Sequence, residues 1–122
     1  MIEVIYLSTE DLLHLAARIG VLDVRDMGLL DSAAMRPQSV VFGTESYPML
    51  ADKAAALMES IVGNHPLVDG NKRLGLAAVS LFYEMNGVPL RITNDQAYEF
   101  TIKVAAGETK VPKVVEYSIS FF

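Results

Sequence analysis

Residues 71–87 read NKRLGLAAVSLFYEMNG, and this stretch decides the fold. The spacing predicts a helix over about residues 71–86, with Gly87 in the position that follows a helix end. Apolar side chains lie on almost every side of this helix, whereas a surface helix carries them along one stripe. A helix of this kind is the buried centre of a bundle. The expected fold is therefore all-α, a compact bundle of about five to seven helices around residues 71–86.

Helical periodicity also dominates the rest of the chain. Ser8 and Asp11 have the spacing of a capping box, and Thr93 is a residue that caps helices well. Further helices are expected over residues 8–19, 29–35, 48–62 (with Pro48 in its first turn) and 93–106. The other segments are expected to be extended or irregular: residues 2–7, residues 37–47 as a loop or short extended flap, and the tail from Pro112, which suits a helix or a strand.

The composition narrows the class of protein. The 122 residues suit one domain over residues 1–122, and a hydrophobic fraction of 52% is enough for a compact core. A net charge of −5 argues against direct nucleic-acid binding, which needs a basic face. The chain has no cysteine and only two histidines, which argues against a structural zinc site. Without a signal-peptide pattern or a membrane-length apolar run, the protein is expected to be soluble and cytoplasmic.

One segment concentrates the residues that carry chemistry: residues 65–73 read HPLVDGNKR and lie directly before the central helix. The start of a helix offers unpaired N–H groups and the positive end of the helix dipole. Lys72 and Arg73 add two cations in the first turn, where the dipole alone disfavours them. A bound anion explains their presence, and phosphate is the obvious candidate. Gly70 lets the backbone approach such a ligand closely.

The same segment also supplies a base and a metal ligand. His65 precedes Asp69 by four residues, and a neutral imidazole there is able to accept a proton from an attacking hydroxyl. Asp69 is a hard oxygen ligand suited to a Mg²⁺ that bridges nucleotide phosphates. Asn71 suits a helix cap or a contact with phosphate or metal. Each residue alone has an ordinary structural role, His65 as a helix C-cap for example, but together they are the parts that phosphoryl transfer needs.

The segment resembles the signature of the Fic/Doc family, HxFx[DE]xN[GK]R. The sequences around it resemble the Doc branch of the family, the death-on-curing toxins. Four stretches carry this similarity: Gly28–Leu30, Ala34–Pro37, Lys53–Leu57 and Phe82–Gly87. The resemblance covers about residues 5–107, and it implies the small all-α Fic fold.

Carried over by position, the resemblance implies a role for each polar residue of the segment. His65 is the general base, and Asp69 is the carboxylate on the Mg²⁺ side. Gly70 belongs to the anion-binding loop, and Asn71, Lys72 and Arg73 line the phosphate site, where both cations count among the catalytic residues. The implied cofactors are ATP and Mg²⁺.

Three positions differ from the commonest Fic pattern. Most Fic enzymes transfer AMP and have Gly at the position of Lys72 and a second Arg at that of Leu76. Both differences resemble Doc, which transfers the γ-phosphate of ATP to a threonine of elongation factor Tu and halts translation. Leu67 replaces the usual Phe, which anchors the loop in the core, and we expect Leu to hold the loop less rigidly.

Three hypotheses follow from these residues. The first is a Doc-type protein kinase that blocks translation. The second is an AMP transferase that acts on a protein hydroxyl. The third is a weakly active protein that binds an antitoxin or operator DNA; the intact His65, Asp69 and Arg73 speak against it, and Leu67 speaks mildly for it.

The expected partner is an antitoxin. Some Fic proteins carry an inhibitory helix of the pattern [ST]xxxE[GN], but no Glu in this chain is followed by Gly or Asn. We therefore expect restraint from a second chain, by resemblance to Doc a small antitoxin with a disordered C-terminal segment that folds into a helix on this protein. Nucleic acid would be contacted only through that antitoxin, and no membrane contact is expected.

Overall fold

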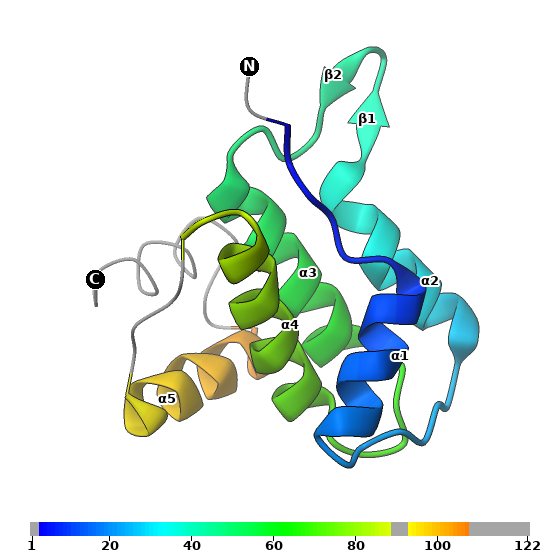
Figure 1. Ribbon diagram of the computed structural model, residues 1–122, viewed down its shortest axis with the longest axis vertical. Coiled ribbons are helices and arrows are strands. Elements are labelled where there is room, and N and C mark those ends of the chain that lie inside the picture. The colour runs from blue at the N-terminus through cyan, green and yellow to red at the C-terminus, as the bar shows by residue number, and fades with distance from the viewer. Residues whose placement is uncertain (1–2, 89–92, 108–122) are drawn as a thin grey trace.

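The computed structural model describes residues 3–88 and 93–107, over which it has five α-helices, a short 3-10 helix and one small hairpin (Figure 1). In chain order these are α1 (Thr9–Arg18), α2 (Met27–Met35), η1 (Arg36–Gln38), β1 (Val40–Val41), β2 (Thr44–Glu45), α3 (Leu50–Asn64), α4 (Asn71–Met85) and α5 (Asn94–Ala105). The predicted helical bundle is confirmed. A single domain over residues 1–122 stays a prediction, and the tail from Pro112 lies outside the described residues. None of the described helices is long and apolar enough to cross a membrane.

Capping residues set where α1 and α5 begin. In α1, the backbone N of Asp11 donates to Ser8 Oγ at 3.1 Å, and the backbone N of Ser8 donates to Asp11 Oδ2 at 2.8 Å. Thr93 and Gln96 form the same reciprocal pair at the start of α5. Side-chain oxygens thus satisfy N–H groups that a helix start leaves unpaired, which confirms the expected caps.

Two other helices differ in extent from the sequence prediction. Helix α2 begins at Met27, two residues before the expected Leu29, because the Asp26 carboxylate caps it by accepting a hydrogen bond from Leu29 N at 3.1 Å. Helix α3 begins at Leu50, so the expectation that Pro48 lies in its first turn is wrong; Pro48 precedes the N-cap residue. Helix α3 also continues through Asn64, beyond the expected end at residue 62.

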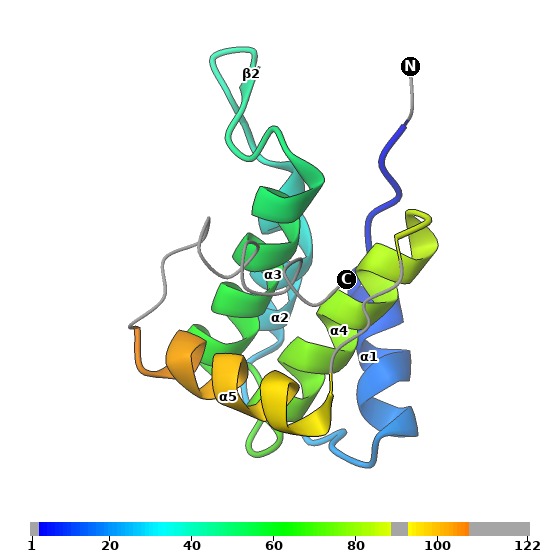
Figure 2. The ribbon, with the colours of Figure 1, turned by 90° about the vertical axis from the view of Figure 1, so that its left-hand side faces the viewer.

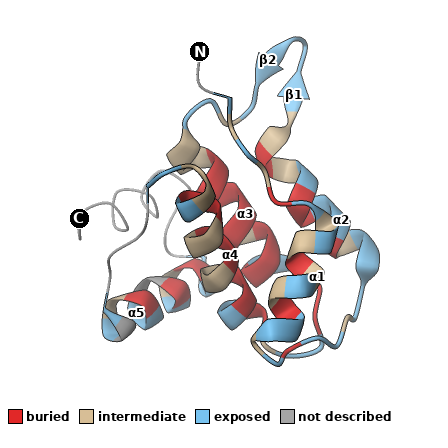
Figure 3. Cartoon of the chain, in the orientation of Figure 1, coloured by how far each residue is buried: buried red, intermediate tan, exposed pale blue. Residues whose placement is uncertain are grey.

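Helices α3 and α4 together form the centre of the bundle. Helix α4 packs against α1, α3 and α5, as its all-round apolar pattern predicts. Buried residues run along most of α3, which shares the central position (Figure 3). The two helices approach closely at Gly75, where an added Cβ would lie 2.7 Å from Cγ2 of Val62. Helix α5 crosses α3 and α4 at one end of the bundle (Figure 2).

The hairpin and the loop of interest lie at opposite ends of α3 (Figure 1). The expected flap is the hairpin β1–β2, in which Val40 pairs with Glu45 and Val41 with Thr44. At the other end, residues 65–70 connect α3 to α4. Because α3 and α4 pack side by side, this connection is short and rigidly supported, and it carries the predicted site.

Candidate active site

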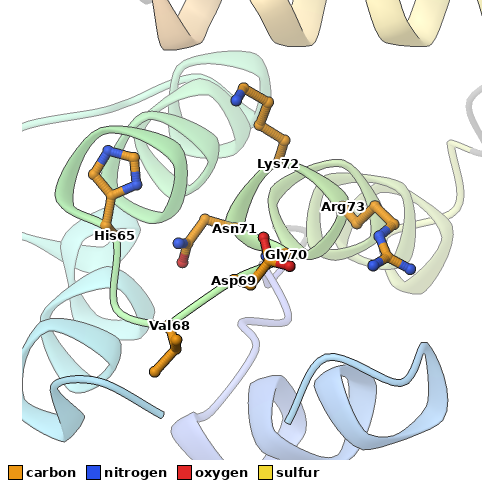
Figure 4. Close-up of a pocket in the computed structure, with 7 residues that line it drawn as sticks. All are labelled: His65, Val68, Asp69, Gly70, Asn71, Lys72 and Arg73. Atoms are coloured by element: carbon orange, nitrogen blue, oxygen red, sulfur yellow. The ribbon is translucent and has the colours of Figure 1, made fainter. Parts of the chain in front are cut away.

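The predicted site residues line one pocket of about 370 Å³ at the start of α4 (Figure 4). Its lining consists of His65, Val68, Asp69, Gly70, Asn71, Lys72 and Arg73. The structure thus brings together every residue that the sequence pattern selected, and Val68 is the one addition. The pocket is built from a helix end, a turn and a helix start, each with its own local cause.

His65 lies where α3 ends, and its backbone has left-handed dihedral angles, φ 53° and ψ 61°. A residue other than glycine pays about 1–3 kcal/mol for such a conformation, so the surroundings must hold it there. The side chain is exposed at one side of the pocket (Figure 4). His65 is therefore the C-cap residue of α3, which is its ordinary structural role. Its side chain also lines the pocket, so one residue has both roles.

The loop after His65 is held by Leu67 and Asn71. Leu67 is only 1% exposed, so it anchors the loop in the core at the position where Phe is usual. Its backbone N donates to Asn71 Oδ1 at 2.9 Å, and its carbonyl accepts from Asn71 Nδ2 at 3.0 Å. Asn71 is 8% exposed. Its amide therefore shapes the loop in this structure, and its predicted contact with phosphate or metal stays a prediction.

Gly70 permits both the turn and its close packing. Its φ is +85°, in the region that favours glycine, and it occupies the N-cap position of α4. An added Cβ would lie 2.4 Å from Cγ1 of the buried Val21. The backbone N of Gly70 donates to Asp69 Oδ1 at 2.9 Å, and the Asp69 carboxylate is otherwise exposed at the pocket. Only glycine fits at this position, because of its backbone conformation and its packing on Val21. Its predicted place in an anion-binding loop stays a prediction.

The first turn of α4 forms the opposite side of the pocket. Its backbone N–H groups have no acceptor inside the helix, which is general for the start of an α-helix. Lys72 and Arg73 are exposed and project in different directions from α4 (Figure 4). No acidic residue lies in this first turn. The arrangement is suited to an anion, with two cations that are able to reach different parts of one ligand.

A second pocket of about 260 Å³ lies between α4 and α5. Lys72 and Arg73 line both pockets, so the two cavities adjoin at these side chains. The remaining lining comes from Leu76 on α4 and from Ala97, Tyr98, Thr101 and Ile102 on α5. The candidate anion site thus adjoins a cavity with apolar and aromatic walls. The sequence prediction did not include the α5 residues, because helical spacing alone does not show which helix α4 meets.

The segment between α1 and α2 supports the pocket from outside, and the sequence prediction missed it. Val24 and Leu67 form an antiparallel bridge, and the backbone N of Val68 donates to the carbonyl of Asp23 at 2.8 Å. The guanidinium of Arg25 donates to two carbonyls at the end of α3. These contacts join residues about forty positions apart. No local sequence pattern predicts these contacts. The segment has one residue that a sequence analysis is able to interpret, Asp26, which is a typical helix N-cap.

The donor set fits a magnesium ion that is shared with a bound phosphate. Among the described residues, no three His, Asp or Glu side chains converge as they do in a cage built by protein alone. Mg²⁺, however, commonly takes one or two carboxylates together with substrate phosphates and water. The exposed carboxylate of Asp69, beside the anion site, meets that requirement.

Comparisons with known proteins agree with this geometry. The family model described as the Fic/DOC family matches residues 6–83, which include the whole pocket segment. The chain is also 53% identical over 87 residues to a protein of Mycolicibacterium smegmatis named Toxin Doc, an alignment that covers 70% of this chain and 67% of that protein. The chain belongs to the Fic/DOC family.

Proposed function

We propose that this chain is a Doc-type toxin that transfers the γ-phosphate of ATP to a serine or threonine hydroxyl of a translation factor. Elongation factor Tu is the expected substrate by resemblance, and the cytoplasm, where it is found, is the expected location. The observation that carries the proposal is the single pocket shared by His65, Asp69, Gly70, Lys72 and Arg73. The 53% identity to a protein named Toxin Doc supports the toxin assignment.

The two adjoining pockets suit the two halves of a nucleotide. Phosphates would lie at the start of α4, where backbone N–H groups and the helix dipole favour negative charge. Lys72 and Arg73 would contact the phosphate oxygens from different directions. The nucleoside would lie between α4 and α5, against Leu76 and Tyr98, because this cavity shares its cationic wall with the anion site.

In the proposed transfer step, His65 accepts the proton of the acceptor hydroxyl. A neutral imidazole accepts the proton of the acceptor hydroxyl while the oxygen bonds to the γ-phosphorus. The bond between that phosphorus and the oxygen bridging to the β-phosphate breaks, and ADP leaves. Lys72, Arg73 and the helix start compensate the charge on the phosphate oxygens. Mg²⁺ held by Asp69 and the phosphates would neutralise further charge.

Leu76 favours phosphate transfer over AMP transfer. In the family pattern stated above, AMP transferases have a second Arg at this position, where a cation would hold further phosphates. Here Leu76 is half-buried and lines the cavity between α4 and α5, so it adds no charge to the anion site. Lys72 also favours phosphate transfer over AMP transfer, because its long side chain fills space that glycine would leave open.

A toxin of this type requires a partner that restrains it, and we propose a small antitoxin whose C-terminal segment folds on binding. The described surface exposes large apolar side chains, including Val40, Val41 and the fully exposed Phe42 of the hairpin. Exposed apolar side chains of this kind are suited to a partner that folds around a few apolar anchors. Contact with operator DNA would come through the antitoxin, in keeping with the net charge of −5.

Labelled ATP tests the reaction. The purified chain is incubated with elongation factor Tu and with ATP labelled at either the α- or the γ-phosphate. The proposal expects label from the γ position only, and no label when His65 is replaced by Ala. Label from the α position would instead support the AMP transferase, and no label from either position would support the weakly active binding protein.

Expression in bacteria tests the toxin assignment separately. The chain alone is expected to stop growth, whereas its His65→Ala variant, at equal soluble levels, is not. Co-expression with the gene that neighbours it upstream is expected to restore growth. Normal growth with soluble wild-type protein alone would contradict the assignment.

A further inference from the structure

Arg25 contacts three consecutive residues at the point where α3 ends. Its Nε donates to the carbonyl oxygen of His65 at 2.7 Å, and its Nη2 donates to the carbonyl oxygen of Asn64 at 2.9 Å. Its backbone N donates to the carbonyl oxygen of Pro66 at 2.8 Å. The last carbonyls of a helix lack donors within the helix, and a cation is favourable at that end of the dipole. Arg25 therefore supplies hydrogen-bond donors to the last carbonyls of α3 and fixes the path of the chain that leaves this helix.

The orientation of His65 depends on this path. No described residue forms a hydrogen bond with its imidazole, and the bond from Arg25 goes to its backbone carbonyl. The left-handed backbone of His65, with φ 53°, sets the direction in which its Cβ leaves the chain and therefore the region that the ring is able to reach. The guanidinium of Arg25 holds that backbone on both sides, through the carbonyl of Asn64 before it and the carbonyl of His65 after it. A general base must lie within hydrogen-bond reach of the proton that it accepts. The backbone conformation of His65 therefore affects the rate of proton transfer.

We infer that Arg25 is a positioning residue for the transfer reaction, and this inference rests on the proposed role of His65 as the base. Arg25 holds the backbone of His65 so that its imidazole faces the pocket. The planar guanidinium is suited to this, because it donates two hydrogen bonds in a fixed geometry to two neighbouring carbonyls. A lysine would supply the charge without that geometry.

Three variants separate positioning from general stability. Arg25→Met keeps the aliphatic stem and removes the donors, and Arg25→Lys keeps the charge. The matched control is Arg36→Met, because Arg36 also donates to α3, to the Ala56 carbonyl at 3.4 Å and to Ser60 Oγ at 3.1 Å, but at a distance from the pocket residues along that helix. Each variant is examined for its melting temperature, kcat, and KM for ATP.

Nuclear magnetic resonance provides a readout that does not require activity. The chain has only two histidines, His14 on the exposed face of α1 and His65, so a ¹H–¹⁵N spectrum of the imidazoles has two spin systems. A His14→Gln variant assigns them. Arg25→Met is expected to shift and broaden the His65 signals and to leave those of His14 unchanged.

The expected kinetic result is a split between kcat and KM. Arg25→Met lowers kcat about 10- to 100-fold, the scale of a misplaced catalytic group, while KM for ATP stays close to the wild-type value. Arg25→Lys recovers part of kcat. Arg36→Met lowers the melting temperature but changes neither kcat nor the His65 signals at temperatures where it is folded.

Two results would overturn the inference. One is wild-type kcat with unchanged His65 signals in Arg25→Met, or in Arg25→Lys if the Met variant does not fold. The other is a loss of kcat that matches the loss of folded protein, as in the Arg36 control. If the wild-type chain transfers no group at all, the proposed function fails, and the response of the His65 signals alone decides whether Arg25 positions this side chain.

Discussion

The side-chain amide of Asn71 and the backbone of Leu67 form a closed pair of hydrogen bonds, at 2.9 and 3.0 Å. A second asparagine has the same geometry at the other end of α4. Asn86 Oδ1 accepts from Ile5 N at 2.9 Å, and its Nδ2 donates to the Ile5 carbonyl at 2.9 Å. One pair holds the loop of the candidate active site, and the other holds the N-terminal segment. The two asparagines therefore form a matched set for experiment.

We expect Asn71→Ala and Asn86→Ala both to lower stability and to differ in their effect on activity. Asn71→Ala leaves the two buried backbone groups of Leu67 without partners, which lowers the free energy of unfolding by about 1–3 kcal/mol. Asn86→Ala removes bonds to Ile5 and to the Phe82 carbonyl, and the exposed groups of Ile5 are able to bond water instead. Only Asn71→Ala releases the loop that carries the pocket, so only this variant should lose phosphate transfer. Urea denaturation and initial rates measure the two effects. Equal activity in both variants would contradict a role for Asn71 in shaping the site.

Gly70→Ala tests the close packing beneath the anion loop. Its control is Gly87→Ala, because Gly87 has a similar φ of +81° but no atom within 4 Å of an added Cβ. Gly87→Ala should cost about 1–2 kcal/mol, for the left-handed backbone alone. Gly70→Ala should cost about 1–3 kcal/mol more because of the contact with Val21, and it should weaken ATP binding.

Calorimetry measures the affinity of both glycine variants for ATP, and urea denaturation measures their stability. In the Gly70→Ala background, Val21→Ala is expected to remove the contacts with Cγ1 and Cγ2 of Val21, at 2.4 and 3.2 Å, but to leave the contact with its Cβ at 2.6 Å and the backbone strain. A Gly70→Ala variant as stable as Gly87→Ala, with wild-type affinity for ATP, would show that the approach to Val21 is not needed.

The buried Tyr83 is expected to make the stability of the fold depend on pH in the alkaline range. This residue is 2% exposed, and its hydroxyl has no hydrogen-bond partner among the described residues. Burial, aided by the negative charge of Asp52, raises the pKa of Tyr83 from 10.0 to about 12. The folded state therefore keeps the phenol proton at a pH where the unfolded state loses it. The free energy of unfolding should be unaffected by this group below pH 10 and should fall as pH rises to about 12.

The comparison of Tyr83→Phe with wild type isolates this effect. The variant should be at least as stable at neutral pH, because a buried hydroxyl without a partner is removed. Its stability should fall less than that of wild type between pH 10 and 12. Tyr98→Phe, at an exposed position, is the control and should follow wild type. Identical slopes for Tyr83→Phe and wild type would contradict the raised pKa.

The sequence predicted what is local along the chain. The caps at Ser8 and Thr93 depend on residues three positions apart, and the pocket lies almost entirely within residues 65–73, so one stretch of sequence contained it. The start of α4 was predictable for the same reason, because Gly70 and the apolar run after it are adjacent.

The sequence did not predict contacts between distant segments. Arg25 lies forty residues before His65, and its own neighbours have no pattern that indicates a contact with the end of α3. Val21 is an ordinary apolar residue until the fold brings it against Gly70. The hairpin turn was also missed in detail, because Phe42 has a φ of 50°, which a residue with a side chain rarely adopts.

The most direct test of the account is the intact mass of elongation factor Tu after incubation with ATP, Mg²⁺ and this chain. Wild-type protein and His14→Ala are expected to add one phosphate, because His14 is exposed on α1 and does not line the pocket. His65→Ala is expected to slow this addition by about 10²- to 10⁴-fold while ATP still binds, since a general base has been removed. The much heavier adenylyl adduct, no adduct at all, or an undiminished rate with His65→Ala would each contradict the claim that His65 drives phosphate transfer.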